Sequence, residues 1–431
     1  MEAIGLLFLC IFVFLFAMGA KRIEKTIITA PMFFLGLGYA LSFTEFFESG
    51  QTEHSLHLVA EVTLIILLFL DASQIDLRAL RKHYIWPERM LIIGLPLSIA
   101  LGTFAAWFFL PGWPLVAVAL VASLLAPTDA ALGQSVVSNK RVPERVRHGL
   151  TVESGLNDGL ALPIVLLFAS LTAEAMGADG RNWFIFGAKQ LILGPIVGIA
   201  VGALGAAIML IAHKKELTSN LFEGVGALSL AGVAYLFAGE IGGNGFIAAF
   251  IGGLTFGNIV KGRCRFLFEF TESEGQLLMW GAFFLLGLAL LPEAIAHLTP
   301  RIFGLILVSL FIVRPVAIWI SLTGAGAAPP TKLFFGWFGP RGLATALFAL
   351  LIIPQIGHPY AEPVLVIAIN AVWISALLHG ISAMPAGTVY AKLVDKKGPC
   401  QETAPIMAPF ENTLRPIKSD TSAANKMGSK K

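Results

Sequence analysis

The sequence predicts an all-α polytopic membrane protein, and three of its features support this prediction. Hydrophobic residues make up 56% of the 431 residues, and the mean hydropathy is +0.80. Charged residues make up only 13%, whereas soluble domains carry about 25%. Apolar stretches also recur along the whole chain, and each approaches the roughly 20 residues that a helix needs to cross a bilayer. These features exclude a soluble globular protein.

We count about 13 such stretches, and the basic residues between them support the count. The first is short, but no basic residue precedes it, so we interpret it as a span and not as a cleaved signal peptide. The polar residues 398–431 lack periodicity and predict a disordered cytoplasmic tail. The predicted spans are 3–20, 27–45, 55–73, 88–110, 113–137, 149–175, 183–212, 219–239, 243–260, 274–297, 301–323, 332–355 and 361–391.

The distribution of basic residues predicts the orientation, because cytoplasmic loops are enriched in Lys and Arg. With the N-terminus outside and the C-terminus in the cytoplasm, the basic clusters all fall on the cytoplasmic side. They are Lys21/Arg22/Lys25, Arg78/Arg81/Lys82, Lys140/Arg141/Arg145/Arg147, Lys214/Lys215, Lys261/Arg263/Arg265, Lys332 and Lys392/Lys396/Lys397. The opposite loops carry little beyond Arg181 and Arg301 and are acidic near Glu45 and Glu48.

Two of the predicted spans are interrupted. The fifth contains Ala126-Pro127-Thr128, and the twelfth contains Gly339-Pro340. A proline can simply kink a helix. The fifth and twelfth spans, however, are seven apart in the series. Successive spans alternate in direction and seven is odd, so these two would cross the membrane in opposite directions. Such a matched pair is typical of inverted repeats with two discontinuous helices around a binding site near the midplane.

Ionisable residues inside predicted spans point to the functional site, because a charge in the bilayer is costly. Asp129 follows the break in the fifth span, and Glu153-Ser154-Gly155-Leu156-Asn157-Asp158 lies in the sixth. Helical spacing pairs Glu153 with Asn157 and Ser154 with Asp158 on two adjacent faces. We expect the second pair to face Asp129 and a cation, and the first pair to face a structural partner such as an arginine.

This set of side chains suits an alkali cation, which prefers hard oxygen ligands. Carboxylates of Asp129 and Asp158, the Ser154 hydroxyl and the backbone oxygens freed at Thr128 supply them. Either a proton or a cation neutralises a buried carboxylate, so the two compete for one site. The three cysteines show no metal-ligand spacing, and we expect no cofactor.

At these residues the chain resembles the monovalent cation:proton antiporters, specifically the NhaP-type Na+/H+ antiporters related to animal sodium/proton exchangers. The matching segments keep the family's order and cover most of the chain, and APTD followed by ESGLND is the most specific feature. They are LLFLDASQIDLRAL (67–80), ASLLAPTDAAL (122–132), VPERVRHGLTVESGLNDGLALPIVL (142–166), GGNGFIAAFIGGLTFGN (242–258), FIVRPVAIW (311–319) and FGPRGLATALFAL (338–350).

The resemblance implies an NhaA-like antiporter fold in residues 1–397, two such chains forming a homodimer in the cell membrane. A mobile core would comprise residues 55–175 and 301–391, and the dimerisation helices would comprise 1–45 and 183–297. The resemblance places Na+ on Asp129, Asp158, Thr128 and Ser154, with Asp71 as an outer ligand. It pairs Glu153 with an arginine, for which Arg314 is the first candidate and Arg341 the second.

The resemblance also implies electroneutral 1:1 exchange and a role in pH homeostasis, because the Asn157-Asp158 pair is similar to that of the electroneutral branch. Asp71 departs from the glutamate common at its position, and Asn244 from a serine. Two alternatives remain open at the level of sequence. One is a K+/H+ antiporter of the same superfamily. The other is an intramembrane aspartyl protease with Asp129 and Asp158 as its dyad.

Overall fold

The computed structural model describes residues 2–23, 26–44, 49–75, 77, 85–129, 132–137, 139–176, 183–260, 275–396, 398 and 400–403. Every regular element in these ranges is helical, so the predicted fold class is confirmed. The tail from residue 404 and the basic clusters at residues 78–82 and 261–265 lie outside the described residues.

The helices follow the predicted spans in order, with most interruptions where Pro or Gly residues occur. Their bounds are α1 (Glu2–Ile23), α2 (Ala30–Leu41), α3 (Ser49–Ser73), α5 (Ile85–Arg89), η1 (Met90–Gly94), α6 (Leu95–Phe109), α7 (Leu115–Leu124), α8 (Gln134–Val137), α9 (Glu144–Ala175), α10 (Trp183–Lys214), α11 (Asn220–Glu240), α12 (Gly245–Val260), α14 (Gln276–Ala289), α15 (Leu291–Ala296), α16 (Pro300–Val308), η3 (Ser309–Val313), α17 (Arg314–Ser321), α18 (Pro329–Trp337), α19 (Leu343–Ile356), α20 (Ala361–Asp395) and η4 (Gln401–Thr403).

Within the described ranges, six helices are long and apolar enough to cross a membrane. They include the composite helix Ile85–Phe109, α9 and α20. Five further apolar helices are shorter, among them α7 and α19. These two are short because α7 ends at the first break and α19 begins at the second. Each therefore forms only part of a predicted span.

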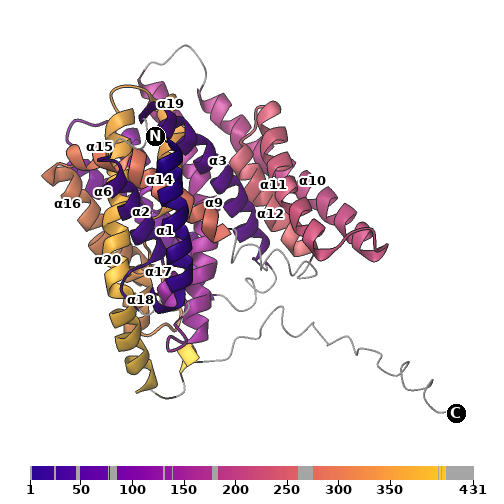
Figure 1. The fold of residues 1–431 in the computed structure, drawn as a ribbon. Helices are drawn as coiled ribbons and strands as arrows, with labels where there is room; N and C mark the ends of the chain where they lie inside the picture. The colour runs from indigo at the N-terminus through magenta and orange to yellow at the C-terminus, as the bar shows by residue number, and fades with distance from the viewer. Residues whose placement is uncertain are drawn as a thin grey trace.

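The bundle has two parts that meet along α3 and α9. In Figure 1, α10, α11 and α12 form a group on one side, and the remaining labelled helices lie on the other side of α3. Glycines at positions 194, 198 and 202 form one stripe of α10, and a Cβ on any of them would come within 3.0 Å of the backbone of α12 or of Asn244 just before it. Such small-residue stripes let membrane helices approach closely.

Two series of helices repeat the same order of features, as expected for inverted repeats. The first consists of a helix containing the π-helix η1, the broken α7–α8 and the long α9. The second consists of a helix containing the π-helix η3, the broken α18–α19 and the long α20. Each long helix contains a proline well inside it, Pro163 in α9 and Pro385 in α20. Both breaks are therefore flanked by equivalent neighbours.

A short segment beyond α20 folds back onto the bundle. The Glu402 side chain is only 3% exposed and accepts hydrogen bonds from the Ala328 backbone N–H (3.0 Å) and the Thr331 hydroxyl (2.8 Å). Arg145, in the first turn of α9, donates to the Gln401 carbonyl oxygen at 3.0 Å. The segment thus joins the beginnings of α9 and α18.

Candidate ion-binding site

The two helix breaks meet at Asp129. The Asp129 backbone N–H donates to the Pro340 carbonyl oxygen at 2.9 Å. The Leu343 backbone N–H in turn donates to Asp129 Oδ2 at 2.8 Å. Asp129 therefore lies at the N-terminus of α19, whose partial positive charge favours a carboxylate there. The break in one span and the break in the other form a single structural unit.

Gly342 allows this close contact. A Cβ at position 342 would lie 1.8 Å from Asp129 Oδ2 and 2.3 Å from Asp129 Cβ. No side chain larger than hydrogen fits without moving one of the two breaks. The glycine is thus a steric requirement of the site.

Glu153 on α9 forms a buried ion pair with Arg314. Arg314 Nη1 lies 3.1 Å from Glu153 Oε1, and Nη2 lies 3.0 Å from Oε2. Both side chains are about as buried as the surrounding core, at 3% exposed. Bidentate pairs of this kind are the strong form of the arginine–carboxylate interaction. Arg341, the second candidate from the sequence, makes no hydrogen bond to Glu153 among the described contacts.

Thr128 links the two faces of α9 that the sequence analysis assigned to separate roles. Its hydroxyl lies 3.4 Å from Glu153 Oε2 and 3.3 Å from Ser154 Oγ. It also accepts a hydrogen bond from Asn157 Nδ2. The Thr128 hydroxyl therefore contacts both the ion-paired Glu153 and Ser154, which lies on the face of α9 predicted to bind the cation.

Asp158 and Asp71 lie near Asp129 in the interior. The charges of Asp129, Asp71 and Glu153 all act on Asp158, and a Cβ on Gly155, one turn before Asp158, would lie 4.0 Å from Asp71 Cβ. The buried Asp158 Oδ1 has no hydrogen-bond partner among the described residues. This oxygen is therefore open to a proton or a cation.

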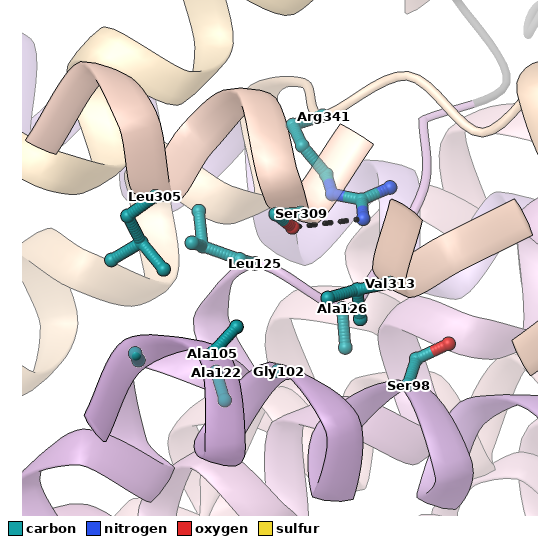
Figure 2. A pocket seen from close by; sticks show the side chains of 11 residues that line it. Ser98, Gly102, Ala105, Ala122, Leu125, Ala126, Leu305, Ser309, Val313 and Arg341 are labelled. Carbon is teal, nitrogen blue, oxygen red and sulfur yellow. Dashed lines mark hydrogen bonds between the residues drawn. The ribbon is translucent and has the colours of Figure 1, made fainter. Parts of the chain in front are cut away.

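Arg341 is a residue of the second break, and its side chain lines a small cavity of about 10 Å³. Its guanidinium donates to the Gly339 carbonyl oxygen at 2.5 Å and reaches Ser309 Oγ at 3.5 Å. Figure 2 shows it pointing towards Ser309, with Gly102 and the alanines of α6 and the first break nearby. The cavity has room for about one water molecule. Arg341 therefore compensates the polar backbone of the break, and Arg314 compensates Glu153.

A polar chain on α20, which sequence reasoning missed, holds the second break in place. The Arg341 backbone N–H donates to Ser375 Oγ at 2.7 Å, and Ser375 Oγ lies 3.1 Å from His379 Nδ1. His379 Nε2 lies 2.8 Å from the Trp337 carbonyl oxygen. His379 Nδ1 also lies 2.9 Å from the Ser375 carbonyl oxygen, so both ring nitrogens have partners. The available signal was a Ser and a His at i and i+4 inside an apolar helix.

The family follows from the sequence as a whole. Residues 4–388 match the family model described as "Sodium/hydrogen exchanger, transmembrane". The chain belongs to the sodium/hydrogen exchanger family. It is therefore a membrane transporter that exchanges a monovalent cation for protons. The family and the fold indicate a transporter and not an aspartyl protease.

Several curated antiporters are similar to this chain at 26–29% identity. A K+/H+ antiporter, NhaP of Alkalimonas amylolytica, is 27% identical over 98% of this chain and 73% of its own length. The K+/H+ antiporter NhaP2 of Shewanella baltica is 29% identical over 77% of this chain. The chain spans 57% of that relative's length. A Na+/H+ antiporter of Zygosaccharomyces rouxii is 26% identical over 48% of this chain and 26% of its own length.

A solved structure has the same fold. The sodium proton antiporter MjNhaP1 of Methanocaldococcus jannaschii at pH 8 superimposes with a TM-score of 0.73, covering 91% of this chain and all of that one. The sequence identity is 22%. The similarity shows that this chain has the fold of that antiporter.

Proposed function

We propose that this chain exchanges Na+ for H+ one to one, with the cation and the proton competing for Asp158 beside Asp129. The observation that carries the proposal is the buried Asp158 Oδ1 without a partner among the described residues, next to two broken helices joined through Asp129. Ser154, Thr128 and Asp71 complete the set of oxygens around the cation.

The two carboxylates have different roles in this proposal. Asp129 is held by a backbone N–H at a helix N-terminus, a suitable place for a lasting negative charge. Asp158 instead carries the exchangeable proton. Asn157 is neutral and engaged with Thr128 and Glu153, so it contributes no second exchangeable charge. One proton would then leave for each cation that binds.

The second candidate is K+/H+ exchange, because relatives 27% and 29% identical to this chain are named K+/H+ antiporters. Na+ is our first choice because the set of hard oxygens is small and the family is that of sodium/hydrogen exchangers. Li+ would be accepted by the same ligands. Selectivity among the three ions depends on cavity dimensions that ligand type does not define.

We further propose the setting in which this exchange takes place. The protein is a homodimer in the cell membrane, with the N-terminus outside and the C-terminus in the cytoplasm, and it contributes to pH homeostasis. The core of residues 55–175 and 301–391 moves against the helices of 1–45 and 183–297. Helix α3 lies at the border of this core, because it contacts α9 and α19 of the core and packs on α12 and α14 of the other helices.

Purified protein in proteoliposomes with an internal pH-sensitive dye tests the function. Adding Na+, Li+ or K+ separately should dissipate an imposed pH gradient, fastest with Na+. A faster response to K+ would favour the second candidate, and no response to any of the three would refute exchange. Asp158→Asn should abolish the response while the protein remains folded, and retained full exchange would remove Asp158 from the site.

A further inference from the structure

A second polar position lies outside the acidic site, where α3, α11, α12 and α19 meet. A cavity of about 100 Å³ is lined there by Glu61, Leu64, Tyr235, Phe246 and three leucines of α19, among them Leu347. Glu61 is the one charged side chain in this lining. The cavity has room for several water molecules, whereas the cavity at Arg341 has room for about one.

Glu61 lies at the middle of α3, with twelve helical residues on either side of it. This segment lies inside the predicted span 55–73, although Glu61 was not among the predicted site residues. Its carboxylate accepts a hydrogen bond from the Tyr235 hydroxyl of α11. The Tyr235 ring is itself held against Phe246 of α12, with centroids 4.9 Å apart. An ionisable residue held inside a membrane span in this way points to an ion pathway.

Two helices lead from this cavity to the acidic site. Along α3, Glu61 and Asp71 are ten residues apart, which corresponds to about 15 Å of helix. Along α19, Leu347 lines the cavity, and Leu343, which donates to Asp129, precedes it by one turn, about 6 Å. The cavity therefore lies within a few helical turns of Asp129 and Asp71.

Each of these helices also carries a buried hydroxyl near the cavity. Thr63 lies between Glu61 and Asp71, and Thr345 lies between Leu343 and Leu347. Their side chains are at most 1% exposed. Neither hydroxyl has a hydrogen-bond partner among the described residues. Buried hydroxyls are normally paired, but residues two positions apart lie about 200° apart on a helix, so Thr63 faces away from Glu61 and Thr345 away from Leu347, and neither is assigned to the route.

We propose that Glu61, held by Tyr235, is an access site for the transported cation on one side of the membrane only, from which the ion passes between α3 and α19 to Asp158. The inference rests on the proposed function. A carboxylate and a phenol oxygen offer hard ligands, and a partly hydrated monovalent cation fits the cavity. In the proposed orientation α3 begins outside, so the access site serves the outer face.

Side-specific kinetics test this inference. Right-side-out and inside-out membrane vesicles containing the full chain are assayed for Na+/H+ exchange, and the half-saturating Na+ concentration is measured on each face. Glu61→Gln should raise it about three- to tenfold on the outer face, the effect of one carboxylate at contact distance in water. The value on the inner face should not change. Tyr235→Phe should give a smaller change on the same face.

A matched control removes another carboxylate at the same end of the bundle. Glu240 is exposed at the end of α11, five residues beyond Tyr235, and Glu240→Gln should leave both faces unchanged. If Glu61→Gln leaves the half-saturating Na+ concentration unchanged, or changes it equally on both membrane faces, the access site is overturned. If that variant fails to fold, Tyr235→Phe and Glu61→Asp are measured in the same way, and a shift confined to the outer face is again required.

The outcomes also separate this inference from the proposed function. Wild-type protein without Na+/H+ exchange would refute the function itself. Wild-type exchange together with a symmetric response of Glu61→Gln would refute only the access site.

Discussion

At the scale of single residues, we propose that the site separates structural charges from exchangeable ones. Glu153 is neutralised by both terminal nitrogens of Arg314. Asp129 is held by backbone groups of the opposite break. Asp158 keeps one buried oxygen without a partner among the described residues. The account therefore assigns exchange to Asp158 and stability to Glu153, although the two residues lie five positions apart on one helix.

The stability role of Glu153 can be measured in purified protein. Glu153→Gln leaves the buried Arg314 charge uncompensated, and losing one partner of a buried pair costs about 3–5 kcal/mol. We expect a clearly lower melting temperature in detergent, with unchanged preference among Na+, Li+ and K+ in whatever exchange remains. Altered ion preference at normal stability would contradict the assignment.

Two controls accompany this measurement. Glu293→Gln changes a side chain that is 68% exposed and should alter the free energy of unfolding by less than about 0.5 kcal/mol. The double variant Glu153→Gln with Arg314→Gln should lose less than the sum of the single variants, because the residues interact directly.

At the scale of elements, the two broken spans act as one unit, and α20 holds the second of them. The contacts are backbone groups at Asp129, Pro340 and Leu343. A proline and glycine pattern in sequence predicts where a helix breaks, because both residues act locally. It does not predict which hydroxyl or histidine of a distant helix satisfies the exposed backbone, as Ser375 and His379 do.

The contact between the breaks leads to a prediction for Gly342→Ala. The added Cβ would overlap Asp129, so the breaks must shift. We expect at least a roughly tenfold higher half-saturating Na+ concentration, corresponding to about 1.4 kcal/mol. Gly281→Ala is the matched control, because a Cβ there meets nothing within 4 Å. Equal Na+ affinity in the two variants would show that the close approach is not needed for binding.

The segment after α20 leads to a second prediction at this scale. Burial alone would raise the pKa of Glu402, but hydrogen bonds from the Ala328 N–H and the Thr331 hydroxyl outweigh burial and lower that pKa below its ordinary value. A lowered folded-state pKa contributes stability that is full above the ordinary value of 4.5 and is lost as the pH falls through the folded value.

We therefore expect Glu402→Ala to lower the free energy of unfolding by about 1–3 kcal/mol at pH 7. The difference from wild type should shrink once the pH falls below about 4.5. Thermal unfolding across a pH series measures both effects. Asp395→Ala, at an exposed carboxylate on the end of α20, is the control. A Glu402 effect that stays constant down to pH 3 would contradict the hydrogen-bonding explanation.

At the scale of the whole molecule, the fold was predictable because its main signals are local. Hydropathy defined the spans, and Pro and Gly located both breaks. The acidic residues of the site were visible as charges inside apolar segments. The position of Thr128 between two faces of α9, the polar chain from Arg341 to His379 and the Glu61–Tyr235 contact were not visible. Each depends on side chains that only tertiary packing brings together.

The central claim is that one site binds either the cation or the proton, and the pH dependence of Na+ affinity tests it most directly. The half-saturating Na+ concentration of wild-type proteoliposomes is measured at equal pH on both sides, over a series of pH values. Competition predicts that it rises towards tenfold per unit as the pH falls, while the maximal rate at saturating Na+ is retained. A half-saturating concentration that stays constant while the maximal rate falls would mean that Na+ and H+ bind separately, and would contradict the account.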